Sequence, residues 1–264
     1  MSNFLAIYKR ELRSFFFSPL AYTIYFLFIV ICSVFFYLYF SSYIKYSEML
    51  MMQQMRMGGA GGPQLPNFTE FVLLGLTNVM AFILLFVLPI LTMRLFSEEK
   101  RMGTIELLMT YPLKDSEVLL GKFLAALTVF AGMLILTLFY PVITYFIDSS
   151  QTYFPAIFAS YFGVFMLGTA FMALGIFFSS LTENQLISSL VSFITLLVLW
   201  MIGFVDDLYP GIIGSICNEI SIYAHFEQFS KGVIDTGHVA YYGLFTLFFL
   251  FATLRILESN RWRG

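Results

Sequence analysis

FVLLGLTNVMAFILLFVLPILTM is the sequence from Phe71 to Met93, and none of its side chains is charged. As an α-helix, a segment of this length measures about 35 Å, which exceeds the roughly 30 Å of a bilayer's hydrocarbon core. The next residues, Arg94 to Lys122, read RLFSEEKRMGTIELLMTYPLKDSEVLLGK and carry both signs of charge at high density. The sequence therefore predicts a membrane-spanning helix that leads into a polar, water-exposed segment.

Five further segments are apolar and long enough to span a membrane. They are Leu20–Phe40, Phe123–Ile147, Pro155–Ser179, Leu186–Val205 and Val239–Leu257. The composition agrees, since 59% of the residues are hydrophobic and only 11% are charged, against roughly 25% charged residues in soluble domains. We therefore predict an all-α integral membrane protein with six transmembrane helices, in which residues 1–264 form a single transmembrane domain.

Lysine and arginine are distributed unevenly between the two sides that six spans create. The side that holds both termini and residues 94–122 carries 11 of them, and the other side carries three, Lys45, Arg56 and Lys231. Because cytoplasmic segments are enriched in basic residues, we predict cytoplasmic termini and a cytoplasmic segment 94–122. The location would be the cell inner (cytoplasmic) membrane, crossed several times, with residues 206–238 as an extracytoplasmic segment before the last span.

Residues 1–19 have the pattern of an amphipathic helix. At helical spacing, apolar side chains gather on one arc, and Lys9, Arg10, Arg13 and Ser14 gather on another. Such a helix lies in the membrane interface, with its apolar face toward the acyl chains and its cations toward anionic head groups. The alternative is a positively charged flank that only orients the first span.

Residues 94–122 are the best candidate for binding a soluble partner. A helix from Glu98 to Met109 would carry apolar side chains such as Ile105 and Leu108 beside its charges, which favours docking over a solvated loop whose charges only satisfy topology. Gly103 lies in the middle of this expected helix, where glycine costs about 1 kcal/mol relative to alanine. It indicates either the close approach of another backbone or a break between two short helices.

Two segments of the sequence resemble the permeases of ABC-2 type transporters. They are TMRLFSEEKRMGTIELLMTYPLKDSEVLLGKFLAA, Thr92–Ala126, and ISIYAHFEQFSKGVIDTGHVAYY, Ile220–Tyr242. Both look most like the branch of gliding-motility-associated permeases and the permease of nitrous oxide reductase maturation. With the six-span layout and the N-terminal helix, the resemblance extends over nearly the whole chain. It implies a membrane subunit that couples ATP hydrolysis by a separate ATPase subunit to export of, or mechanical work on, an unknown substrate.

The resemblance also implies a coupling helix between spans two and three, and a set of partners. The positions that match the family's cytoplasmic element, and that would seat in a groove of the ATPase, are Glu98, Glu99, Arg101, Gly103, Thr104 and Glu106. One six-span subunit supplies half of such a transporter, so a second permease chain, identical or different, would complete a dimer. The expected partners are an ABC ATPase subunit, that second chain and the lipid bilayer, with an extracytoplasmic accessory protein as a further candidate and no nucleic acid.

The sequence contains no phosphate-binding loop of its own. Its only Gly-Lys pair is Gly121-Lys122, which is followed by Phe123 and does not complete the pattern G-x-x-x-x-G-K-[ST]. We therefore expect a transport subunit that is not an enzyme and needs no cofactor. The alternative function is a non-transporting membrane scaffold or channel that binds a regulator through its cytoplasmic loop.

No metal site is expected. His225 and His238 lack a metal-binding motif and a nearby cysteine pair, and a lone loop histidine is more often structural. A cluster of methionines follows the first span, at Met49, Met51, Met52, Met55 and Met57. Thioether ligands favour Cu(I), but we favour a surface helix that extends the first span and uses methionine for adaptable contacts.

Overall fold

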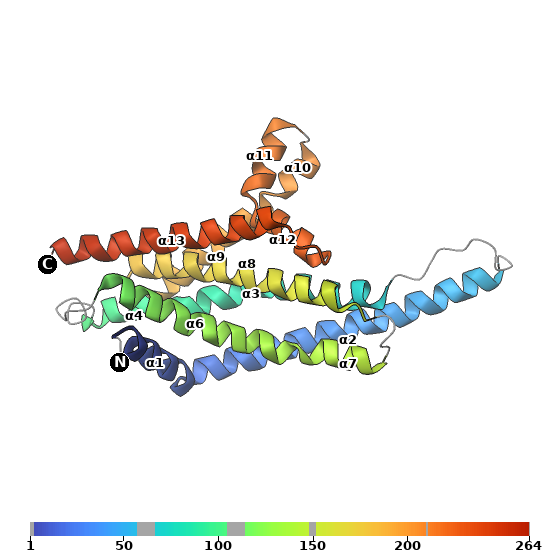
Figure 1. Cartoon of the computed structure of the whole chain (residues 1–264), viewed down its shortest axis with the longest axis horizontal. Helices are drawn as coiled ribbons and strands as arrows, with labels where there is room; N and C mark the ends of the chain where they lie inside the picture. The colour runs from blue at the N-terminus through green and yellow to red at the C-terminus, as the bar shows by residue number, and fades with distance from the viewer. Residues whose placement is uncertain (1–2, 57–66, 105–113, 148–151, 210, 264) are drawn as a thin grey trace.

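The computed structural model describes residues 3–56, 67–104, 114–147, 152–209 and 211–263. Within these residues the chain is helical and contains no strand, and six of its helices are long and apolar enough to cross a membrane. The predicted all-α fold with six transmembrane helices is confirmed. The spans run along the long axis of the molecule (Figure 1).

The first span is much longer than its apolar core. Helix α2, Pro19–Arg56, has 38 residues, which corresponds to about 57 Å. It extends beyond the other helices at one end of the molecule (Figure 1). The predicted segment Leu20–Phe40 is only its first part, because hydropathy detects lipid contact, whereas the Met, Gln, Glu and Lys residues that follow still favour a helix.

The second span is built from three consecutive helical pieces. A π-helical turn, η1, Thr69–Leu74, leads into α3, Gly75–Thr92, and Met93 joins α3 to α4, Arg94–Arg101. Met93 itself keeps helical dihedral angles. The polar segment predicted to begin at Arg94 therefore starts as a continuation of the span and not as a loop.

The third span also begins earlier than its apolar segment. It consists of α6, Asp115–Thr137, and α7, Phe139–Ile147, which follow one another along the bundle (Figure 1). The span was expected to begin at Phe123. Asp115 and Glu117 lie in the first turn of α6, where negative charge is favourable at the positive end of the helix dipole.

Helix α8, Phe154–Leu181, is the centre of the bundle. It packs against α3, α6, α9, α12 and α13, and most of its length is buried. Small residues make this possible, since Ala159, Gly163, Gly168 and Gly175 let neighbouring helices approach closely. Small residues at helix contacts are the usual solution in membranes, where packing rather than the hydrophobic effect holds helices together.

The remaining chain forms the fifth span, three short helices and the last span. The bounds are α9, Gln185–Met201; α10, Phe204–Leu208; α11, Ile212–Ile220; α12, Ile222–Ser230; and α13, Thr236–Arg263. Figure 1 shows α10 and α11 projecting from the side of the bundle. Helix α12 packs against α8 and α9, so part of segment 206–238 belongs to the packed bundle.

The two chain ends lie at the same end of the bundle as α4, and the far end of α2 lies at the opposite end (Figure 1). This arrangement agrees with six spans and with termini on one side. Which side that is remains the prediction made from the distribution of basic residues.

Candidate functional site

The N-terminal helix α1, Asn3–Phe17, packs on the start of α6. Ile7 and Phe15 are buried, and a Cβ atom at Gly121 would lie 2.9 Å from Ile7 Cγ2, so a larger residue at position 121 would force Ile7 to shift. Part of the apolar face that was expected to meet acyl chains therefore packs against protein. Leu5, Phe16 and Phe17 remain exposed and available to lipid.

Four charged side chains meet where α1, α4 and α6 converge. Lys122 Nζ lies 3.1 Å from Glu11 Oε1 and 2.9 Å from Glu99 Oε1. Arg10 Nη2 lies 2.7 Å from the same oxygen of Glu11 and 3.0 Å from that of Glu99. We call Arg10, Glu11, Glu99 and Lys122 the four-charge cluster. Each carboxylate in it accepts from both cations, and the cluster is neutral overall.

Burial makes this cluster a strong constraint. The Lys122 side chain is 1% exposed, and those of Glu11 and Glu99 are 11% and 14% exposed. Lys122 Nζ also lies 5.3 Å from the centroid of the Phe96 ring, a distance at which the ring face attracts a cation. Desolvating such charges costs several kcal/mol per ion unless each is paired, so the three helices are held in the one arrangement that pairs them.

The pKa of Glu11 reflects this balance. Burial raises the pKa of the Glu11 carboxyl, but the attraction of Lys122 and the contact with Arg10 outweigh it, and the net shift is downward. The stabilisation from the charged form is therefore complete above the pKa of a free glutamate, about 4.3. It is lost as the pH falls through the lowered pKa of the folded protein.

Arg94 ties the joint between α1 and α2 to the start of α4. Its Nη1 donates to Ser18 Oγ at 2.9 Å, and its guanidinium carbon lies 4.8 Å from the centroid of the Phe15 ring. The joint at Ser18 is therefore fixed by the same helix that carries Glu99.

A serine on α8 fixes the other side of α4. Ser179 Oγ donates to the carbonyl oxygen of Met93 at 2.8 Å and accepts from the backbone N–H groups of Phe96 and Ser97 at 3.1 Å each. Ser97 Oγ in turn donates to the Ser179 carbonyl oxygen at 3.0 Å. All four contacts lie at the α3–α4 junction, so α4 is bonded to the central helix of the bundle as well as to α1 and α6.

Helix α4 ends earlier than the helix expected at Glu98–Met109. It ends at Arg101, and Gly103 adopts a φ of 68°, a left-handed conformation that favours glycine. Among the described residues, a Cβ at Gly103 would meet nothing within 4 Å, so Gly103 marks the break at the end of α4. Residues 105–113, including Glu106 and Met109, lie outside the described residues.

The predicted coupling residues thus divide into two groups. Glu99 belongs to the four-charge cluster, and Glu98 is half-buried. Arg101, Gly103 and Thr104 are exposed at the end of the helix, and Glu106 lies outside the described residues. Met102, which was not among the predicted residues, is exposed beside them. We call Arg101, Met102, Gly103 and Thr104 the α4 tip.

Sequence reasoning missed the residues that hold the α4 tip in place. It assigns no role to Glu11, Ser97 or Ser179, and it treats Lys122 only as the last residue of the polar segment. One signal was available: Lys122 lies between apolar neighbours in VLLGKFLAA, and a lysine at such a position needs a buried partner.

A family model described as ABC-2 family transporter protein matches residues 5–222. The match covers well over half of the chain and includes α1, α4 and the start of α6. The chain belongs to the ABC-2 transporter family. It is therefore a permease subunit of a multi-pass membrane transporter, and the family implies an ATPase partner. No curated protein matches the chain.

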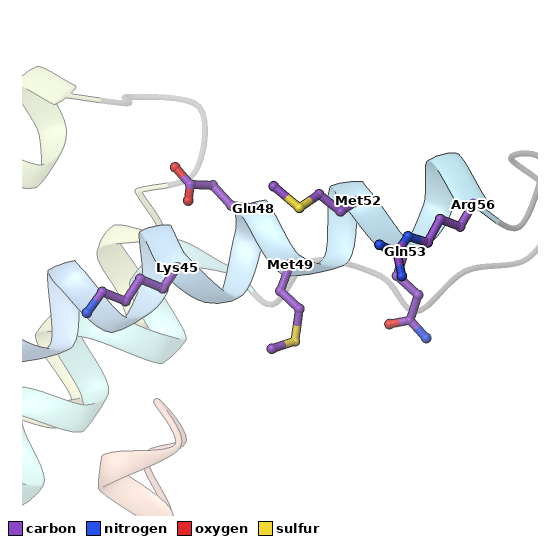
Figure 2. A pocket seen from close by; sticks show the side chains of 6 residues that line it. All are labelled: Lys45, Glu48, Met49, Met52, Gln53 and Arg56. Atoms are coloured by element: carbon purple, nitrogen blue, oxygen red, sulfur yellow. The ribbon is translucent and has the colours of Figure 1, made fainter.

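The other candidate sites of this ABC-2 permease do not converge on a ligand. Met49 and Met52 both line a surface hollow on α2, and in Figure 2 their side chains point away from one another. His225 and His238 contact one another through their Nδ1 atoms at 2.7 Å, and His225 Nε2 lies 3.0 Å from the Glu219 carbonyl oxygen. In the described residues, no group of three or more His, Cys, Asp or Glu side chains could hold a metal ion.

Proposed function

We propose that this permease couples ATP hydrolysis by a separate ABC ATPase to export of, or mechanical work on, a substrate, and that the ATPase docks on the α4 tip. One observation carries the proposal: a short, exposed helix end is anchored to three other helices through its buried residues. A docking element must both present a surface and transmit force, and these two requirements are met by different residues of α4.

The transmission path runs through the buried contacts of α4. Glu99 connects it to Lys122 on α6 and to Arg10 on α1, and Ser97 connects it to Ser179 on α8. A displacement of the α4 tip would therefore move these helices together as a rigid unit. Such a unit suits a transporter that alternates between two states biased by nucleotide.

The proposal extends to sidedness and assembly. The α4 end of the bundle would be cytoplasmic, as the excess of basic residues on that side indicates. A second permease chain, identical or different, would complete the transporter, and the ATP-binding site would lie entirely on the ATPase chains. The branch of gliding-motility and nitrous-oxide-reductase-maturation permeases remains our assignment from the resemblance of Thr92–Ala126 and Ile220–Tyr242.

Introducing negative charge at the α4 tip should weaken ATPase binding without unfolding the permease. In the double variant Arg101→Glu, Met102→Glu, we expect the affinity for the ATPase to fall by at least about tenfold, which corresponds to about 1.4 kcal/mol. Mismatched charges at an interface can cost several kcal/mol, and both side chains are exposed. The measurement is the fraction of ATPase that co-purifies, together with the thermal midpoint of the permease.

Glu48→Lys is the control for this variant, because Glu48 is exposed on α2 at the opposite end of the bundle. It should leave ATPase binding unchanged. Glu99 is unsuitable as a surface probe, since its reversal would break the four-charge cluster. Wild-type co-purification of the double variant would refute docking at the α4 tip.

A further inference from the structure

An apolar groove runs between α2 and α3 on the outside of the bundle. It has a volume of about 560 Å³ and extends from Ile24 to Phe35 on α2 and from Ile90 to Asn78 on α3. The two helices run in opposite directions, so Ile24 and Ile90 lie at the α4 end and Phe35 and Asn78 at the other end. Eleven helical steps correspond to about 16 Å, which is half of a bilayer core and the length scale of one acyl chain.

A polar pocket continues from the end of this groove that lies away from α4. It has a volume of about 510 Å³ and is lined by η1, α3 and α12, with Glu70, Tyr223, Glu227 and Lys231 among its residues. Asn78 lines both the groove and the pocket. The two spaces therefore share one lining residue, which stands between the apolar groove and the polar pocket.

The charges of the polar pocket favour a cation. Glu227 Oε1 pairs with Lys231 Nζ at 2.7 Å, whereas Glu70 is exposed and has no ion pair within the described part of the chain. Two carboxylates against one ammonium leave the pocket with one net negative charge. The Tyr223 ring adds an aromatic surface, which attracts ammonium groups.

Asn78 has an unused acceptor at the junction. Its Nδ2 donates to the Leu74 carbonyl oxygen at 3.0 Å, but its Oδ1 is buried and has no partner within the described residues. A buried acceptor without a donor is costly. A ligand that brings a hydrogen-bond donor to the boundary between groove and pocket would satisfy it.

We propose that the groove and pocket bind a bilayer phospholipid whose head group carries an ammonium, with one acyl chain along α2 and α3 and the ammonium at Glu70. Binding of this lipid does not depend on the proposed transport function. Only the further step, that this lipid is the class of substrate transported, rests on it. Lys231 is placed to meet the phosphate, and Glu70 and Tyr223 are placed to meet the ammonium. A second copy of the chain is a poorer occupant of the groove, because the same concave surface on that copy could not fill it.

The test is lipid selectivity of the full-length permease. The purified chain is equilibrated in nanodiscs of equal phosphatidylethanolamine and phosphatidylglycerol, transferred to detergent, and the retained lipids are quantified by mass spectrometry. We expect at least a fivefold preference for phosphatidylethanolamine in the wild type. Glu70→Gln should reduce this ratio to about one, whereas the matched control Glu48→Gln should leave it unchanged.

A second variant separates the groove from the pocket. Val79→Trp, whose side chain would fill the groove at a residue that lines it, should lower retention of both lipids severalfold without changing their ratio. Equal retention of the two lipids by the wild type, or an unchanged ratio in Glu70→Gln, would overturn the proposal. So would efficient disulfide formation between two chains through Phe35→Cys, which would show that a second copy fills the groove.

The readout needs no ATPase. Loss of selectivity alongside normal ATPase co-purification would remove this proposal and leave the transporter assignment intact. Selective lipid retention by a permease that binds no ATPase would support the lipid site and contradict the proposed coupling to an ATPase.

Discussion

Replacing Lys122 with methionine is expected to destabilise the permease by about 3–5 kcal/mol, the range measured when one partner of a buried ion pair is removed. The ammonium is 1% exposed and contacts two carboxylates. Its loss leaves Glu11 and Glu99 facing one another with only Arg10 to compensate. We expect a lower thermal midpoint in detergent and faster hydrogen exchange in α1, because α1 is held to α6 through this contact.

Two comparisons make this prediction specific to the cluster. Lys231→Met removes a lysine whose side chain is 58% exposed and pairs with a neighbour on the same helix, so its effect should stay below about 1 kcal/mol. The triple variant Glu11→Gln, Glu99→Gln, Lys122→Met removes the buried charges together and should recover much of the lost stability, since uncharged replacements of whole buried networks are often neutral. Wild-type stability of Lys122→Met would contradict the assigned role of the cluster.

The triple variant also separates stability from transmission. If the four-charge cluster carries movement from the α4 tip to α1 and α6, a stable triple variant, in which Arg10 is the one remaining charge of the cluster, should still bind the ATPase while coupling hydrolysis to transport less efficiently. Stability recovered together with full coupling would show that the cluster only holds the helices in place.

Replacing Gly163 with valine is expected to produce the second large effect. A Cβ at this position would lie 2.2 Å from Phe229 Cβ and 2.7 Å from Phe229 Cγ. Because the nearest atom is next to the backbone of α12 and is not the far end of a flexible side chain, α12 itself must move away from α8. Overpacking of this kind costs typically 1–3 kcal/mol and occasionally more, and we expect the upper end of that range.

Gly243→Val is the matched control, since Gly243 lies on a transmembrane helix and a Cβ there would meet none of the described residues within 4 Å. Both variants add the same β-branched residue to a helix, so any difference in thermal midpoint reports packing alone. Equal midpoints would mean that the contact between α8 and α12 yields easily, and that α12 is not a fixed part of the bundle.

The sequence predicted the six spans because each must bury a long apolar surface in lipid, and that requirement is visible in hydropathy alone. The ends of the spans could not be predicted in the same way. Helix α2 continues to Arg56 through polar residues, and α6 begins at Asp115 among charges. In both places the helix extends beyond the apolar segment, so the apolar segment marks only a part of each helix.

The sequence did not separate the buried from the exposed residues among the predicted coupling positions. Glu99 had been placed on the docking surface because its partners are distant in sequence: Lys122 is on the next span and Arg10 is on the first helix. Gly103 left two interpretations open, and its positive φ agrees with a break in the helix. Contacts of this kind depend on how helices converge, and a linear pattern of charges does not contain that information.

Cross-linking from Met102 tests most directly whether an ABC ATPase docks on the α4 tip. Met102→Cys would be introduced after Cys32 and Cys217 are replaced with serine, and the untagged complex would be treated with a short thiol-to-amine cross-linker. We predict a major adduct to a chain that carries a G-x-x-x-x-G-K-[ST] loop, and no such adduct from Met55→Cys on the far end of α2. An accessible Met102→Cys thiol that gives no adduct to an ATPase, in a preparation that contains one, would contradict the account.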